Sequence, residues 1–146
     1  MPVIEEVTTY SPLIYEAVKN LLAELDTTLL LTEDRFKKII ETENSHLFII
    51  KVKSSAEEEN GNIAGMLTLG IYYTPGGTKA WIEDVVVNGA YRGEGYGRML
   101  VQHAIDFAKL ANIDMLMLTS RPSRTAANQL YQNMGFKIKQ TNLYFM

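Results

Sequence analysis

The sequence predicts a single α/β domain whose sheet mixes antiparallel hairpins with one parallel step. Strand-like and helix-like apolar patterns alternate along all 146 residues, and 47% of the residues are hydrophobic, enough for one core. A Pro75-Gly76-Gly77 turn joins two long β-rich segments, which indicates an antiparallel hairpin. A glycine-rich turn then joins a strand to a helix that leads to another strand, which indicates a parallel step. We expect residues 1–146 to form one domain.

The first third of the chain is expected to contribute a strand and two helices. Pro2 to Val7 can form the first strand. Ser11 is a typical N-cap with Pro12 at the first helical position, and the apolar stripe that follows ends near Asp26. Thr32 is expected to cap a second helix.

The middle of the chain predicts three strands. Leu47 to Val52 is a continuous apolar strand, and Ile63 to Tyr73 is a longer one. The third strand, Ala80 to Val87, follows the Pro-Gly-Gly turn. The polar, acidic segment from Ser54 to Asn62 is expected to form a mobile hairpin connection.

The last third predicts two helices and the remaining strands. Helical spacing holds from Met99 to about Ala111, and Met115 to Leu118 is apolar on both faces, as in a central strand. Ser123 is expected to cap the last helix and Gly135 to end it. The chain is then expected to close with two further strands, Phe136-Lys137-Ile138-Lys139 and Asn142 to Met146.

The run Tyr91-Arg92-Gly93-Glu94-Gly95-Tyr96-Gly97-Arg98 predicts an anion site, because it lies between a strand and a helix. Its three glycines allow close backbone approach, and the first N–H groups of the helix would point at the anion. The two arginines add permanent positive charge. The glycine spacing fits neither the dinucleotide fingerprint nor the nucleotide P-loop.

The pattern Arg92-x-x-Gly95-x-Gly97 resembles the pyrophosphate loop of the GNAT superfamily of acyl-CoA-dependent N-acyltransferases. The run from Ala127 to Phe136, ANQLYQNMGF, resembles that family's late helix and Gly-Phe strand entry. Both motifs occur in the family's order, and the resemblance extends from end to end. It implies a mixed, mostly antiparallel sheet with about four flanking helices, in which two parallel central strands splay apart to admit acetyl-CoA.

The resemblance implies where the cofactor contacts lie. Backbone groups of Val85 and Val87, with Val86 between them, would pair with the pantetheine arm. Asn128 would contact CoA, as in some family members, and the alternative is a solvent-facing amide. The pyrophosphate would bind N–H groups of the loop residues Arg92, Gly93, Glu94, Gly95, Tyr96, Gly97 and Arg98. One departure is Arg124, which stands where many family members have an Asn that contacts the cofactor.

Two residues are candidates for acid and base. The resemblance places Tyr131 where the family often has the acid that protonates the leaving thiolate; the alternative is an ordinary helix aromatic. Glu83 is the candidate base, and the alternative is a buried carboxylate satisfied by backbone donors. Its neighbour Asp84 would point to the opposite face unless a bulge intervenes, so only one of the two is expected to reach the cleft easily.

Composition limits the function classes. The chain has no Cys, which excludes disulfides, thiolate metal sites and a Cys acyl-enzyme, and its two isolated His residues predict no metal site. No apolar run approaches the roughly 18 residues of a membrane span, and the N-terminal residues do not form a signal peptide. A cytoplasmic protein without membrane partners is expected.

Charge is unevenly distributed along the chain. Residues 1–91 hold 7 Lys/Arg and 14 Asp/Glu, a net charge of −7, and residues 92–146 hold 7 and 3, a net charge of +4. The second part suits a phosphate-bearing cofactor and the first a cationic amine acceptor. No basic, aromatic-interleaved stripe predicts nucleic-acid binding.

The leading hypothesis is therefore an N-acetyltransferase that moves acetyl from acetyl-CoA to a primary amine by direct attack. The amine can belong to a small molecule or a peptide, and a homodimer is possible. The acceptor wall is expected from the first two helices, the Asp26-Thr27-Thr28 connection and the Asn142 to Phe145 end. The alternative is a non-catalytic acyl-CoA-binding or regulatory domain.

Overall fold

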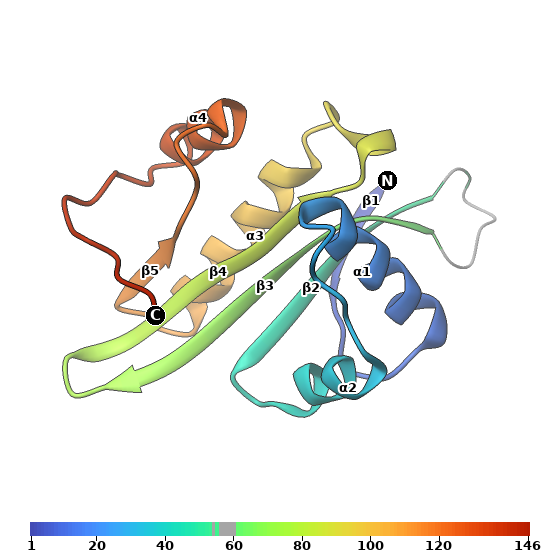
Figure 1. Cartoon of the computed structure of the whole chain (residues 1–146), viewed down its shortest axis with the longest axis horizontal. Helices are drawn as coiled ribbons and strands as arrows, with labels where there is room; N and C mark the ends of the chain where they lie inside the picture. The colour runs from blue at the N-terminus through green and yellow to red at the C-terminus, as the bar shows by residue number, and fades with distance from the viewer. Residues whose placement is uncertain (54, 56–60) are drawn as a thin grey trace.

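A computed structural model describes residues 1–53, 55 and 61–146 (Figure 1). Most of the predicted hairpin connection, Ser54 to Asn62, lies outside the described residues. The strands are β1 (Pro2–Glu6), β2 (Ser45–Val52), β3 (Asn62–Thr74), β4 (Gly77–Val87) and β5 (Met115–Leu118). The helices are α1 (Pro12–Leu25), α2 (Glu33–Glu41), α3 (Tyr96–Leu110) and α4 (Thr125–Asn133), with a short 3₁₀ turn η1 (Gly89–Tyr91).

The five strands form one mixed sheet in the order β1-β2-β3-β4-β5. The first three pairings are antiparallel, and β4 pairs with β5 in parallel. The β3–β4 hairpin closes between Thr74 and Gly77, at the predicted Pro-Gly-Gly turn. The predicted combination of antiparallel hairpins with one parallel step is confirmed.

The first two helices begin where their capping residues predict. The Ser11 hydroxyl accepts from the Ile14 N–H at 3.4 Å, with Pro12 at the first helical position. The Thr32 hydroxyl accepts from the Arg35 N–H at 3.2 Å. Each cap satisfies a backbone donor that the helix itself leaves without an acceptor.

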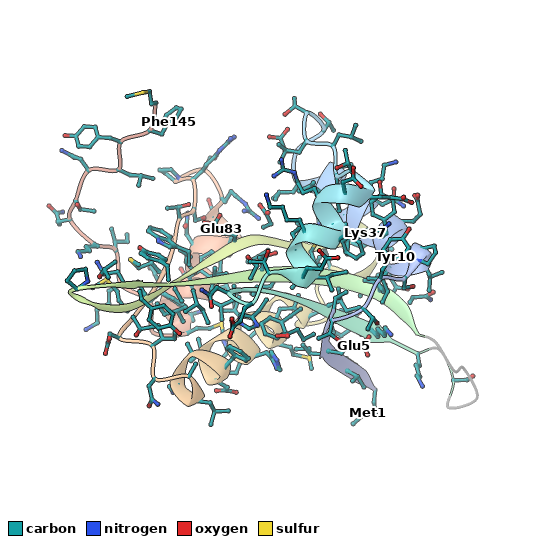
Figure 2. All side chains as sticks on the ribbon, turned by 90° about the horizontal axis from the view of Figure 1, so that it is seen from below. Met1, Glu5, Tyr10, Lys37, Glu83 and Phe145 are labelled. Atoms are coloured by element: carbon teal, nitrogen blue, oxygen red, sulfur yellow. The ribbon has the colours of Figure 1, made fainter. Side chains whose placement is uncertain are left out.

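Helices cover both faces of the sheet and form two separate cores. Figure 2 shows α1 and α2 on one face and α3 on the other. The core under α3 consists of Phe48, Ile50, Ala64, Leu67, Leu69, Ala80, Ile82, Leu100, Val101, Ala104 and, from α4, Tyr131. The core under α1 and α2 consists of Val7, Tyr15, Val18, Leu21, Leu31, Phe36, Leu47, Ile49, Met66 and Val86.

The two predicted C-terminal strands, Phe136 to Lys139 and Asn142 to Met146, are wrong. The structure has no strand there, and Ile138 is 82% exposed. β5 is the last strand in the sheet order, and neither segment pairs with it. Alternating apolar residues predict which side chains share a face, but a strand forms only where a neighbouring strand accepts its backbone hydrogen bonds.

The predicted Ser123 cap is also wrong, because the residue that precedes α4 is Arg124, which makes no side-chain capping bond. The side chain that orders this turn comes from within the helix. Asn128 donates from its amide nitrogen to the carbonyl oxygens of Arg121 at 2.9 Å and Pro122 at 3.4 Å. A helix interior residue therefore organises the loop that precedes α4.

Replacement of Phe36 by Ala should strongly destabilise the fold. Its side chain is fully buried, and its ring centroid lies 5.6 Å from that of Tyr15 and 6.1 Å from that of Tyr10. A cavity of this kind costs about 3–5 kcal/mol of unfolding free energy, measured by urea denaturation. Leu30→Ala, at a side chain that is 71% exposed, is the control and should change it by about 0.5 kcal/mol or less. Equal losses in both variants would contradict the described core.

Candidate functional site

A deep cleft opens where β4 and β5 stop pairing. The parallel register covers four residue pairs and ends at Ile82 and Leu118, while β4 continues to Val87. The cleft has a volume of about 1290 Å³. Residues from both sides of the sheet line it, including Tyr131 of α4 and Leu29 of the α1–α2 connection. It therefore passes through the sheet between the two strands.

A β-bulge shapes the wall that β4 contributes. Thr68 pairs with Glu83 and Met66 with Val86, so two residues of β4, Asp84 and Val85, stand opposite one residue of β3. Asp84 has a φ of 51°, in the left-handed region that non-glycine residues rarely adopt. Because of the bulge, both adjacent carboxylates line the cleft. The sequence predicts that both carboxylates reach the cleft only if a bulge intervenes, and the structure contains that bulge.

Both carboxyl groups bind a proton more tightly than usual, for partly different reasons. Partial burial raises the pKa of Glu83, and the negative charge of Asp84 raises it further. Partial burial also raises the pKa of Asp84. Both side chains reach solvent inside the open cleft, so protein atoms around them restrict their hydration without removing it. A proton is therefore held more tightly here than on a fully hydrated carboxylate.

The glycine loop forms a tight turn at the start of α3. Gly93 and Gly95 both have φ of 84°, and Gly95 is the N-cap residue. The first helical hydrogen bond runs from the Met99 N–H to the Gly95 carbonyl at 3.1 Å, so the N–H groups before Met99 have no acceptor within α3. Their position at a helix N-terminus favours an anion.

Two side-chain hydrogen bonds hold the loop and the turn before it in place. Arg92 donates from Nε to the Val87 carbonyl at 3.3 Å, which ties the loop to the end of β4. The Glu24 carboxylate accepts from the Gly89 N–H at 3.0 Å, which ties it to the end of α1. The end of β4 and the end of α1 thus fix the position of the loop.

Tyr131 lies on the cleft side of α4, and its side chain is 7% exposed. Burial raises the pKa of its phenol, and the positive charge of Arg124 opposes that shift. The phenol therefore stays protonated at neutral pH and can donate its proton. Its ring also packs edge-on against Phe136, with centroids 6.2 Å apart.

The end of α4 fixes the backbone of Tyr131. The Phe136 N–H donates to the Tyr131 carbonyl at 3.0 Å, and the Gly135 N–H donates to the Gln132 carbonyl at 3.1 Å. Gly135 has a φ of 102°, so this is the Schellman motif that glycine favours. The Gly135-Phe136 pair of the second sequence motif therefore fixes the backbone of Tyr131 through the hydrogen bonds that end α4.

One cleft residue that the sequence analysis missed is Ser120. It follows β5, and its hydroxyl is buried without a hydrogen-bond partner among the described residues. A buried hydroxyl without a partner is unusual and fits a site where a ligand supplies the partner. A single serine in a loop gives no sequence pattern that would distinguish it.

Most of the predicted site residues converge on the cleft. Those that line it are Glu83, Val85, Val86, Val87, Arg92, Gly93, Gly95, Tyr96, Gly97, Arg98 and Tyr131. Glu94 and Asn128 are not among the lining residues, and the Asn128 amide nitrogen binds the loop before α4. Their predicted cofactor contacts stay predictions.

The cleft carries opposite charges on different walls. Its acidic lining residues are Glu24, Asp26, Glu83 and Asp84, and its basic ones are Arg92, Arg98, Arg121 and Arg124. All four acidic residues come from α1, the residue after it, or β4, whereas the basic ones come from the glycine loop, the start of α3 and the loop before α4. The site thus suits a ligand pair of opposite charge.

A metal cluster and a membrane-spanning helix are both absent from the part of the chain that the structure describes. Within it, no group of three or more His, Asp or Glu residues could hold a metal ion. None of the described helices is long and apolar enough to cross a membrane.

Comparison with known proteins identifies the family. The profile of the Acetyltransferase (GNAT) family matches residues 14–136. The chain belongs to this family. Both sequence motifs and the whole cleft lie within the matched residues.

Curated relatives of this GNAT protein share parts of it. It is 38% identical over 64 residues to the uncharacterized N-acetyltransferase YhdJ of Bacillus subtilis, covering 43% of this chain and 45% of that protein. It is 34% identical over 77 residues to a streptothricin acetyltransferase of Streptomyces lavendulae, covering 53% and 40%. The matched part thus spans less than half the length of these relatives.

Solved structures match over nearly the full chain. A putative acetyltransferase from Agrobacterium tumefaciens has a TM-score of 0.78 and 25% identity, covering 99% of both chains. A transcriptional regulator from Bacillus halodurans has a TM-score of 0.79 and 28% identity, covering 100% of this chain and 99% of that one.

Removal of the Glu83 charge should stabilise this GNAT protein at pH values above those at which carboxylates usually titrate. Its folded pKa lies above its unfolded pKa, so ionisation at higher pH costs the folded state stability, and the cost disappears below the unfolded pKa. Glu83→Gln should therefore raise the unfolding free energy at pH 8 more than at pH 4. Solvent in the open cleft keeps the gain below about 1 kcal/mol.

Urea unfolding at both pH values measures this difference. Glu16→Gln, on the exposed part of α1, is the control and should change the unfolding free energy by about 0.5 kcal/mol or less at either pH. A Glu83→Gln protein that is less stable than the parent at pH 8 would contradict the interaction described here.

Proposed function

We propose that this protein is an N-acetyltransferase that moves acetyl from acetyl-CoA to a primary amine by direct attack in a ternary complex. The observation that carries the proposal is the cleft between β4 and β5, which joins an anion-binding helix start to a pair of carboxylates and a buried phenol. A phosphate-bearing acyl donor fits the basic wall and a cationic amine fits the acidic one.

The residues present fit acetyl-CoA. N–H groups at the start of α3 offer donors for the pyrophosphate, beside Arg92 and Arg98. Beyond Ile82 the cleft edge of β4 has no paired strand, so backbone groups of Val85 can bind the amides of the pantetheine arm. The unpartnered Ser120 hydroxyl faces the same cleft and offers one more donor.

The reacting groups divide the proton transfers between them. Acetyl-CoA supplies an activated thioester, whose C–S bond breaks as the new C–N bond forms. Glu83, directly or through water, takes the proton that the ammonium must lose before the neutral amine can attack, and its raised pKa suits a base. Tyr131 gives a proton to the departing sulfur, and its raised pKa keeps that proton available. The chain has no Cys to form a thioester intermediate.

The alternative is a non-catalytic acyl-CoA-binding domain with a regulatory role. One observation favours it: the Bacillus halodurans structure with 28% identity is described as a transcriptional regulator. Such a domain would need the anion-binding turn but not an acid and a base. The presence of both Glu83 and Tyr131 in the cleft supports the enzyme.

Amine-dependent release of free CoA thiol from acetyl-CoA tests the proposal. The acceptors would be pools of arylalkylamines, polyamines, amino acids, aminoglycosides and short peptides, with products identified by mass spectrometry. Release with one pool and an acetylated product would support the enzyme. Binding of acetyl-CoA by calorimetry without release in any pool would support the non-catalytic domain.

Gly97→Val should weaken acetyl-CoA binding without unfolding the protein. A Cβ at Gly97 would lie 3.7 Å from Val87 and 3.9 Å from Leu130, so valine would project between the two cleft walls. Unlike Gly95, Gly97 does not have a left-handed φ, so the change adds no strain of that kind. The acetyl-CoA Kd should rise at least about tenfold, which corresponds to 1.4 kcal/mol.

Calorimetry measures this Kd, and circular dichroism checks the fold. Gly76→Ala in the β3–β4 turn is the control, because its Cβ would meet only the Thr74 hydroxyl at 3.6 Å. Its Kd should match that of the parent protein. An unchanged Kd for folded Gly97→Val would remove this wall from the cofactor site.

Tyr131→Phe should lower kcat by about 100-fold, the lower range of general acid catalysis, and leave the acetyl-CoA Kd within about twofold. Only the phenol oxygen is lost, so the packing against Phe136 is retained. Tyr91→Phe is the matched control, since Tyr91 also lines the cleft. Steady-state kinetics and calorimetry measure both quantities. Equal kcat values in parent and Tyr131→Phe would exclude the acid role.

A further inference from the structure

A second, smaller hollow opens beside the cleft. Its volume is about 220 Å³, and it is lined by Trp81, Glu83, Thr119 and Leu143. Glu83 and Thr119 also line the main cleft, so the two spaces meet at the proposed base. A group held in the hollow would therefore lie next to the Glu83 carboxylate. In Figure 2, Glu83 lies on the α1 and α2 face of the sheet, away from α3.

The indole of Trp81 forms a fixed aromatic wall in this hollow. Its Nε1 donates to the Tyr72 hydroxyl at 3.2 Å, which satisfies its polar atom and orients the ring. Trp81 is paired with Gly70 on β3, and a Cβ built at Gly70 would meet no atom within 4 Å. The space beside the indole is thus open on the β3 side.

Charged residues of β4 would orient a cation that binds against the indole. Lys79, Trp81 and Glu83 share one face of the strand, because alternate residues of a strand point the same way. Lys79 is paired with Tyr72, at the end of the indole away from the cleft. An ammonium group would be repelled from Lys79 and attracted to Glu83. A cation bound here would therefore direct its charge toward the cleft and its apolar body toward the indole.

We infer that the hollow beside Trp81 is the acceptor subsite and that it selects an arylalkyl primary amine. This inference rests on the acetyl transfer proposed above. The flat apolar group stacks on the indole, and the amine reaches Glu83. Pockets for drug-sized ligands measure about 300–1,000 Å³, so the hollow accommodates one small group and not a whole polyhydroxylated amine.

The sole tryptophan of the chain makes the subsite directly observable. Because Trp81 is the only Trp, fluorescence excited at the red edge of the protein absorption spectrum comes from its indole alone. The probe is 2-phenylethylamine, titrated without acetyl-CoA. Ethylamine, which lacks the ring, and 2-phenylethanol, which lacks the amine, are the ligand controls. Saturable emission change is expected with 2-phenylethylamine, and at least about tenfold weaker binding with either control.

Three variants test the wall during turnover. Trp81→Leu should lower kcat/KM for 2-phenylethylamine about tenfold and leave kcat/KM for ethylamine within about twofold. Tyr72→Phe removes the hydroxyl that holds the indole and should raise KM for 2-phenylethylamine about threefold, with little change in kcat. Tyr73→Phe is the matched control, because Tyr73 is the next residue of β3 and points to the opposite face.

The readouts separate the subsite from the reaction. Equal losses for both amines in Trp81→Leu, or identical kinetics in Tyr72→Phe and Tyr73→Phe, would overturn the subsite while acetyl transfer stands. Emission that titrates with 2-phenylethylamine, in a protein that acetylates no amine, would support the binding site and overturn the transferase. Emission that does not respond to 2-phenylethylamine would overturn the subsite. If Trp81→Leu does not fold, the Tyr72→Phe and Tyr73→Phe comparison decides.

Discussion

The end of pairing between β4 and β5 after Ile82 and Leu118 is the constraint on which the site depends. While paired, the two strands are neighbours in one sheet; beyond that point, the edge of β4 faces the cleft. The bulge at Asp84 falls just past the last pair and brings two adjacent carboxylates to one wall. Without the separation there would be no channel through the sheet, and the glycine loop and α4 would lie on either side of a continuous strand pair.

The two motifs that indicate the family have distinct physical roles in this geometry. The glycine loop leaves backbone donors at a helix start, where an anion can bind. The Gly135-Phe136 pair ends α4. Gly135 adopts a left-handed conformation, and the two backbone N–H groups donate to the carbonyl oxygens of Gln132 and Tyr131. One motif thus provides a binding group, whereas the other fixes the backbone from which the phenol projects.

Apart from the Ser123 cap, features set by neighbouring residues were predictable from sequence, and features set by distant ones were not. The Ser11 and Thr32 caps and the glycine loop each depend on a few consecutive residues, and the structure has them where predicted. The bulge depends on how β4 aligns with β3, so the sequence left it as a condition. The prediction of a strand from Phe136 to Lys139 was wrong for the same kind of reason. The alternation of apolar and polar residues there contains no information about a neighbouring strand. The contact between Trp81 and Tyr72 also arises only from the pairing of β3 with β4.

The separation of the two cores has a consequence for how proteins with this architecture diversify. Side chains under α3 support the glycine loop and Tyr131, whereas side chains under α1 and α2 support the wall that contains Asp26 and Leu29. The sheet lies between them, so repacking on one face is transmitted to the other mainly through backbone shifts. Apart from Glu24, which binds the Gly89 N–H before the glycine loop, residues of α1 and α2 can therefore change in sequence and length while the half of the cleft around that loop keeps its shape. Under the proposed function, such a division allows new acceptors to be acquired by mutation without loss of acyl-donor binding.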